Sequence, residues 1–93
     1  MSTKSVDVKP IRLYHFPMIS PEQSRAARGW LDWSQDDLAK RANVGLSTVR
    51  DFEKGRRTPI GNNMIAIERA LSEAGIQFVA DGDRPVGVRV SAG

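Results

Sequence analysis

The sequence contains no cysteine, which excludes disulfide bonds and thiolate metal sites. A metal ion cannot be held by the single histidine, His15, alone. No apolar run approaches the roughly 20 residues that cross a bilayer, and the N-terminus lacks the apolar stretch of a secretory signal. Ser-His-Asp, metal-ligand and Gly-rich phosphate motifs are also missing. We therefore expect a cytoplasmic protein that is not an enzyme and has no metal site, no cofactor and no membrane partner.

Three of the fourteen basic residues form a cluster in one short part of the chain. Hydrophobic residues make up 40% of the 93 residues, as in an ordinary globular domain. The formal net charge is +3, and three of the basic residues, Lys54, Arg56 and Arg57, lie within one predicted loop. Such a cluster is compatible with a nucleic-acid partner but does not by itself establish one.

The first helix signal is at Ser20. Its hydroxyl can accept a hydrogen bond from an unpaired backbone N–H, and Gln23 completes a capping box. A proline follows Ser20, and it loses nothing at the first helical position because the N–H there would be unpaired anyway. These signals predict a helix over residues 21–31. We expect its inward face to comprise Ala27, Trp30 and Leu31, and we expect Trp33 to pack in the core as well.

A second and a third helix are predicted close together. Ser34 caps a helix over residues 35–42, with Asp37 at its third position near the positive helix end. Asn43 follows, a residue that tolerates the left-handed conformation of a tight helix stop. Only three residues separate this helix from the next, which is predicted over residues 46–54.

Two further elements complete the pattern. Apolar residues recur at helical spacing and predict a helix from residue 62 or 63 to residue 74. After Gly75 the period changes to two, which predicts a β-hairpin with a long loop at residues 81–85. An isolated hairpin is marginal in water. We expect it to pack on the fourth helix, on a candidate strand at residues 9–16, or on the same hairpin of a second subunit.

Two short helices joined by three residues fit both a plain helical hairpin and a helix-turn-helix. The turn favours the second interpretation. Asn43 suits the tight turn, Ala39 is small where the helices would cross closely, and Val44 can fill the gap between them.

The stretch from Trp33 to Pro59, WSQDDLAKRANVGLSTVRDFEKGRRTP, resembles the DNA-binding domain of the Cro/cI-type (XRE) family of phage and bacterial repressors. The matching positions are Ser-Gln at the start of the second helix, Leu-Ala within it, Val after the turn, Ser-Thr-Val in the third helix, Glu-Lys-Gly and Thr-Pro. With the flanking helices the resemblance covers about residues 20–76. The chain departs from the family at Asn43 and Gly45, where the family often has Gly and Ser or Thr.

The resemblance implies a fold that is mainly α, a lambda-repressor-like bundle of four or five helices with a C-terminal β-hairpin and room for an N-terminal strand. It implies that the third helix enters the major groove, with base contacts from Leu46, Ser47, Arg50 and Asp51. The implied phosphate contacts are Gln35, Lys54, Arg56 and Arg57. A largely buried, structural ion pair is implied between Arg28 and Glu53.

Three segments follow from these expectations: an extended arm or strand over residues 1–19, a helix-turn-helix domain over 20–75, and a hairpin for dimerisation over 76–93. The implied function is sequence-specific binding of double-stranded DNA by a small transcriptional regulator, a repressor acting as a homodimer. The alternative is an antitoxin-like protein that binds a toxin through its strand-forming ends and regulates its own operon.

Overall fold

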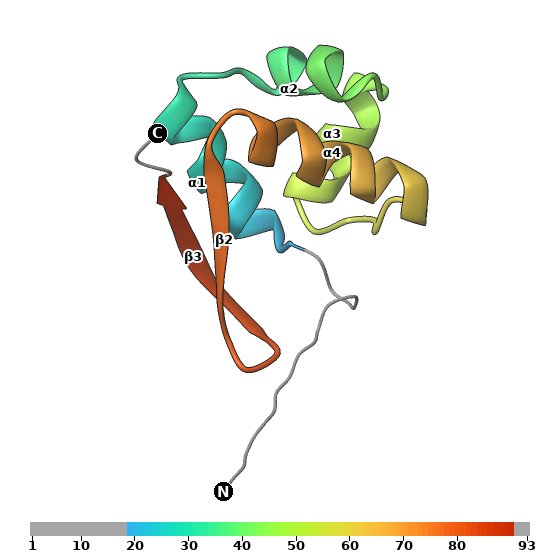
Figure 1. Cartoon of the computed structure of the whole chain (residues 1–93). Coiled ribbons are helices and arrows are strands. Elements are labelled where there is room, and N and C mark those ends of the chain that lie inside the picture. The colour runs from blue at the N-terminus through green and yellow to red at the C-terminus, as the bar shows by residue number, and fades with distance from the viewer. Residues whose placement is uncertain (1–18, 91–93) are drawn as a thin grey trace, which may run out of the picture.

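The computed structural model describes residues 19–90 (Figure 1). The element order is α1 (Pro21–Leu31), α2 (Gln35–Ala42), α3 (Leu46–Glu53), α4 (Gly61–Glu73), β2 (Ile76–Asp81) and β3 (Arg84–Val90). The predicted fold class, a mainly helical bundle with a C-terminal hairpin, is confirmed. His15 and the candidate strand at residues 9–16 lie outside the described residues.

Local capping chemistry sets the helix boundaries. The hydroxyl of Ser20 accepts a hydrogen bond from the Gln23 N–H, and Gln23 Oε1 accepts one from the Ser20 N–H, so α1 begins in a capping box. The start of α2 repeats this exchange between Ser34 and Asp37. Hydrogen bonds from Ser34 hold the pKa of the Asp37 carboxyl below its ordinary value. The end of α2 is Asn43 in the predicted left-handed conformation, with φ 58°.

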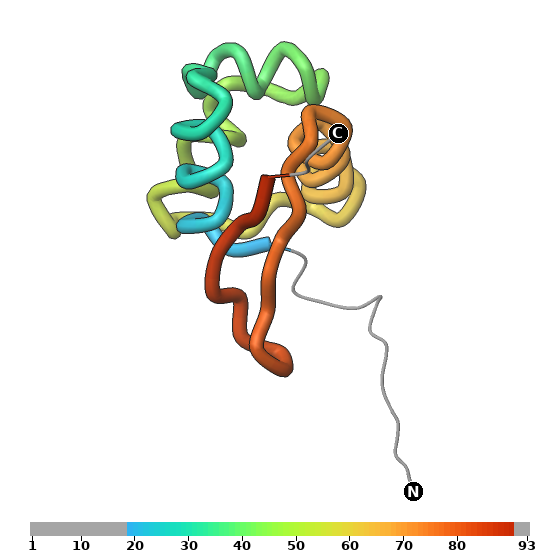
Figure 2. Tube along the Cα trace, turned by 60° about the vertical axis from the view of Figure 1, so that its left-hand side comes forward, coloured from blue at the N-terminus to red at the C-terminus, as the bar shows by residue number. Residues whose placement is uncertain are grey.

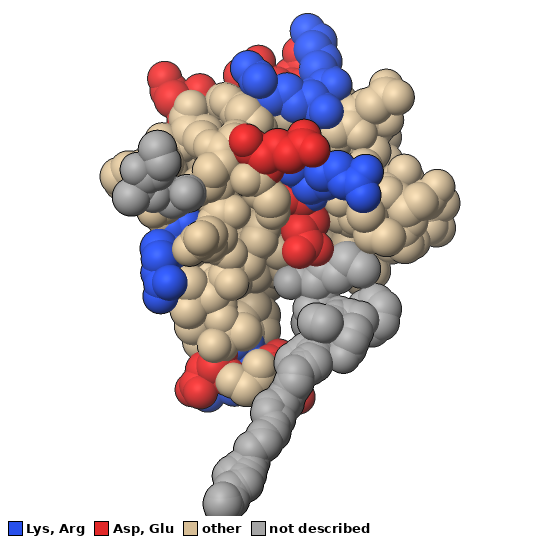
Figure 3. All heavy atoms as spheres, in the orientation of Figure 1, with Lys and Arg blue, Asp and Glu red and all other residues tan. Residues whose placement is uncertain are grey.

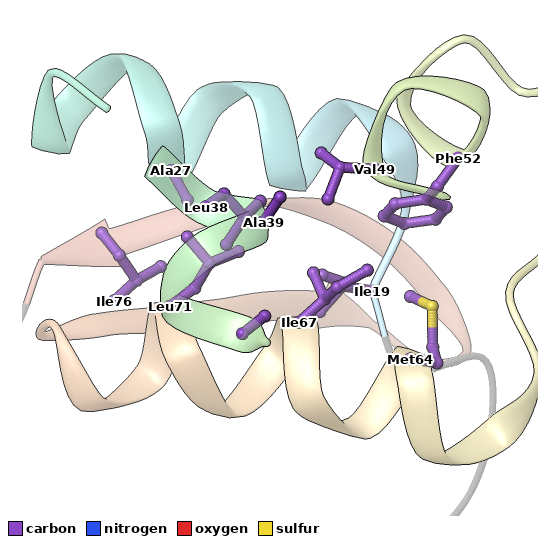
Figure 4. Packing of buried hydrophobic residues seen from close by; sticks show 11 residues of the cluster. Ile19, Ala27, Leu38, Ala39, Val49, Phe52, Met64, Ile67, Leu71 and Ile76 are labelled. Atoms are coloured by element: carbon purple, nitrogen blue, oxygen red, sulfur yellow. The ribbon is translucent and has the colours of Figure 1, made fainter. Parts of the chain in front are cut away.

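One apolar core lies between the helices. All four helices contribute to it, with Ile19 before α1 and Ile76 at the start of β2; its members are Ile19, Ala27, Leu38, Ala39, Ala42, Val49, Phe52, Met64, Ile67, Leu71 and Ile76. Figure 4 shows Ile76 at one end of this core and Phe52 and Met64 at the other. Ala39 is buried where α2 packs against α3 and α4, so its small side chain permits the close approach.

The two tryptophans differ in burial. Trp33 is half-buried and packs against the core. The side chain of Trp30 is 65% exposed, so the prediction that Trp30 is a core residue is wrong. The buried stripe of α1 runs through Gln23, Ser24 and Ala27 towards Leu31. At about 100° per residue, Trp30 lies at the edge of that stripe.

The hairpin turn is shorter than predicted. Strand pairing continues as far as Asp81 opposite Arg84, which leaves only Gly82 and Asp83 in the turn. Gly82 has φ 67°, a conformation that permits a two-residue turn between twisted strands. The long loop predicted at residues 81–85 is therefore wrong.

The hairpin packs on its own helices. β3 lies against α1 and β2 against α4, while the turn end extends away from the helices (Figure 2). Support from α1 was not predicted. The Nε2 of Gln23 donates to the carbonyls of Val79 and Gly87, at 3.0 Å and 2.8 Å. These residues face each other beside a register shift after Val79, where a bulge leaves backbone groups without ladder partners. Gln23 thereby joins α1 to both strands.

Candidate nucleic-acid interface

The turn between α2 and α3 is held by backbone hydrogen bonds. The N–H of Asn43 bonds to the carbonyl of Lys40 at 3.2 Å, and that of Val44 to the carbonyl of Ala39 at 3.0 Å. Val44 then packs partly buried against the core. α3 begins directly after Gly45, whose conformation is extended and whose position carries no side-chain cap. The short turn thus places α3 firmly against α2.

The two faces of α3 have different surroundings. Val49, Phe52 and Glu53 are buried. Of the residues predicted to contact bases, Ser47 and Arg50 are exposed and Asp51 is half-buried.

Leu46, which is also predicted to contact bases, is less exposed than Ser47 and Arg50. Its side chain is partly buried and packs against the core. Only part of it is therefore accessible from outside. The reason is its place at the start of α3, directly after the turn that brings α3 against α2.

A tight reversal after α3 carries three cations. The N–H of Gly55 bonds to the carbonyl of Phe52 at 3.0 Å, and that of Arg56 to the carbonyl of Asp51 at 2.9 Å. With Gly55 at φ 75°, this is the pattern of a Schellman helix end. Lys54, Arg56 and Arg57 are all exposed there. The reversal holds their backbone next to the exposed face of α3.

A hollow of about 220 Å³ adjoins the accessible face of α3. It lies between α3, the loop after it and the first turn of α4, and it is lined by Ser47, Thr48, Asp51, Arg57, Thr58, Pro59, Ile60 and Asn63. Asn63 and Thr58 were not selected from the sequence. The polar pair Asn62-Asn63 at a predicted helix start was the available signal. α4 begins beside this hollow without a side-chain cap and without an acidic residue in its first turn.

Glu53 joins α3 to α1. Its side chain is 1% exposed, and Arg28 Nη2 lies 2.6 Å from its Oε1. Arg28 Nε donates to Oε2 at 2.9 Å, and the Ser24 hydroxyl donates to Oε2 at 2.5 Å. Arg25 donates from Nη1 to the backbone carbonyl of Glu53. The end of α3 is therefore held by three polar residues of α1, namely Ser24, Arg25 and Arg28.

Gln35 is part of the same network. Its Nε2 donates to Glu53 Oε1 at 3.1 Å, a contact that the sequence did not predict. The amide carries a second N–H that is still available to another acceptor. Burial alone would raise the pKa of the Glu53 carboxyl, but hydrogen bonds from Arg28, Ser24 and Gln35 outweigh it, and the pKa is lowered. The hydrogen bond to Glu53 also raises the pKa of Arg28.

Basic and acidic groups lie close together on part of the visible surface, most of which is uncharged (Figure 3). In Figure 3, basic groups over the upper helices lie beside acidic groups. Lys40 pairs with Asp36 at 3.1 Å, and Arg41 lies 4.3 Å from the ring centre of Trp33. Within residues 19–90, by contrast, no ion pair engages Arg50, Lys54, Arg56 or Arg57. These four cations, on and directly after α3, are thus open to an external anion, as are the exposed Arg69, Arg84 and Arg89 elsewhere in the described residues.

The described part of the chain contains no cluster of three or more metal-ligating side chains. None of its helices has the length and apolar character needed to cross a membrane.

Comparison with known proteins agrees with this geometry. A family model described as helix-turn-helix matches residues 25–73, which is more than half of the chain. The match extends from the middle of α1 to the last residue of α4 and includes the whole α2–turn–α3 unit. No curated protein matches the sequence. The chain belongs to the Cro/cI-type (XRE) helix-turn-helix family of DNA-binding transcriptional regulators.

Proposed function

We propose that this regulator is a sequence-specific repressor that binds double-stranded DNA as a homodimer, with α3 in the major groove. The observation that supports this proposal most is the accessible side of α3, where Ser47, Arg50 and Asp51 stand beside an exposed basic turn. The major groove is wide enough to admit an α-helix, and its base edges differ for every base pair.

The proposed reading residues are those on the accessible side of α3. Arg50 is exposed and engages no ion pair among the described residues. A bidentate contact from it to guanine would contribute about 1–3 kcal/mol of discrimination. Ser47 can bond to several bases, and the accessible part of Leu46 can pack on a thymine methyl group. Asp51 can accept from cytosine or orient Arg50.

The proposed anchoring residues surround the reading residues. Lys54, Arg56 and Arg57 would contact phosphates of one strand, and Gln35 would use its remaining amide N–H at the start of α2. The uncapped first turn of α4, with Asn63, adds unpaired backbone N–H groups beside the same hollow. Such contacts supply affinity and salt dependence but little sequence preference.

We propose that the hairpin forms the contact between the two copies of the homodimer. Within the described residues its sheet has only two strands, so each strand has an edge that a second copy can approach. The side chains of Val86 and Val90 are 54% and 37% exposed, and the exposed Trp30 lies on α1, which packs against β3. A homodimer would read two half-sites about one helical turn apart. A bound dimer would also block access to the DNA, which is why we propose repression.

The same hairpin edge supports the antitoxin-like alternative, because a partner's sheet can pair with it as well. Purification of the tagged chain from its native host separates the two functions. A stoichiometric unrelated protein would favour the antitoxin-like function. A homodimer alone would favour the repressor.

Selection of bound sequences from random duplex DNA tests the proposal directly. We expect a two-fold consensus whose half-sites are about 10 base pairs apart from centre to centre. Failure to enrich any sequence would contradict specific binding. A single, unrepeated half-site would contradict the dimer while leaving α3 as the reading helix.

A further inference from the structure

A second hollow, of about 450 Å³, opens on the other side of the loop between α3 and α4. Its walls are mainly apolar and include Ile19, Pro21, Phe52, Pro59 and Met64. Figure 4 shows Phe52 and Met64 at the same end of the core, where they close the inner side of this hollow. Its volume lies within the range of about 300–1,000 Å³ that is typical of small-molecule sites.

One charged side chain interrupts this apolar lining. Among the described residues that line the hollow, Arg57 is the only charged one, and no carboxylate accompanies it. An ion pair between Arg57 and any described residue is likewise absent. A guanidinium beside an apolar cavity suits a ligand with a hydrocarbon body and a planar carboxylate, because it can donate two parallel hydrogen bonds.

We propose that this hollow binds a small amphipathic carboxylate, with its hydrocarbon part against Phe52 and Met64 and its carboxylate on Arg57. A neutral apolar ligand would leave Arg57 without a partner. A larger protein surface would have to insert a side chain between α1, α3 and the loop.

The position of the hollow connects the ligand with DNA binding. Arg57, Thr58 and Pro59 line both this hollow and the polar hollow beside α3. They are therefore the wall between the two. A carboxylate on Arg57 competes with a DNA phosphate for the same guanidinium, so the ligand lowers DNA affinity. The effect of the ligand on DNA affinity rests on the proposed function, whereas binding of the ligand does not.

The first experiment is calorimetric titration of the full chain with sodium octanoate in the absence of DNA. We expect saturable binding of one molecule per chain. Both 1-octanol, which lacks the charge, and acetate, which lacks the hydrocarbon, should bind about ten-fold more weakly or worse. Absence of saturable octanoate binding overturns the proposal. Equal binding of 1-octanol also overturns it, because Arg57 would then have no part in recognition.

Two variants locate the site. Arg57→Gln removes the cation, and Gly61→Leu adds a bulky side chain at a residue that lines the hollow, where a Cβ meets no atom within 4 Å. Each should lower octanoate affinity about ten-fold or more. Arg69→Gln, at an exposed position of α4 that does not line the hollow, is the matched control and should bind octanoate as the parent does. If the parent and both site variants bind octanoate with equal affinity, the assignment of the ligand to this hollow is overturned. Circular dichroism of each variant verifies that it is folded.

The second experiment measures binding to the selected DNA with and without saturating octanoate. We expect the parent to lose affinity and Arg57→Gln to be insensitive. Octanoate binding without any DNA binding would refute the proposed function and leave the ligand site standing. DNA binding that saturating octanoate leaves unchanged would overturn the competition at Arg57.

Discussion

Arg28 and Glu53 form a two-point ion pair that ties α1 to α3. Nη2 lies 2.6 Å from Oε1, and Nε lies 2.9 Å from Oε2. The carboxylate side chain is 1% exposed and the guanidinium side chain 18% exposed. Because Glu53 is the last residue of α3, this pair holds the end of the proposed reading helix against the rest of the bundle.

Removing one partner should be costly. Glu53→Ala leaves Arg28 without its acceptor, and Arg28→Ala leaves a buried carboxylate without its main donor. We expect a loss of about 3–5 kcal/mol in the free energy of unfolding for each, measured by urea denaturation. The double variant R28M/E53L should be more stable than either single variant, since no charge remains uncompensated. A loss below about 1 kcal/mol, as for exposed pairs, would contradict the importance of burial.

Acid should weaken the same interaction. The pKa of Glu53 in the folded chain lies below its ordinary value, so folding favours the ionised form. Its contribution is fully present above the unfolded pKa of about 4.3 and is lost as the pH falls through the lower folded pKa. The free energy of unfolding of the parent should therefore approach that of Glu53→Gln as the pH falls from about 5 to below the ordinary pKa of a glutamate, about 4.3. A difference between the two that stays constant over this range would show that Glu53 ionisation is not linked to folding.

Gln23→Glu should loosen the hairpin without removing the cap of α1. A glutamate keeps an acceptor for the Ser20 N–H but cannot donate to the carbonyls of Val79 and Gly87. Two acceptors then lose their donor, for which we expect about 2–4 kcal/mol. Relative to the parent, the rate of amide hydrogen exchange should increase more in β2 and β3 than in α2 and α3. Gln77→Glu, at an exposed position of β2, is the control. If the exchange rate in Gln23→Glu increased equally in all of these elements, a local role of the Gln23 side chain would be contradicted.

Arg50 and Arg56 should differ in their effect on DNA binding. Arg50→Ala should abolish preference for the selected sequence while non-specific affinity changes little, because its proposed contact is with a base edge. Arg56→Ala should weaken all duplexes similarly and reduce the salt slope by about 1. Titrations of specific and scrambled duplexes at several salt concentrations distinguish the two. If both variants behaved alike, the division into reading and anchoring residues would be wrong.

Features set by neighbouring residues were predictable from the sequence. Ser20 with Gln23 and Ser34 with Asp37 are capping partners three residues apart, so they place helix starts without reference to the rest of the fold. Asn43 ends α2 by its own tolerance of positive φ. These local signals predicted the helix-turn-helix, together with the resemblance of the segment from Trp33 to Pro59 to the Cro/cI-type family.

Features set by residues far apart in the chain were decided by tertiary packing. The donors of Gln23 reach β2 and β3, more than fifty positions away, and no local pattern indicates such partners. Trp30 has the spacing of a core residue, yet it is exposed because the neighbouring elements do not cover the edge of α1. Hydrogen bonding within a helix or turn depends on a few adjacent residues, whereas burial depends on where every other element packs. The helix-turn-helix and its Arg28–Glu53 pair were therefore predictable from the sequence and its family resemblance, while the hydrogen bond from Gln35 to Glu53 and the two hollows beside the loop were decided by the folded chain.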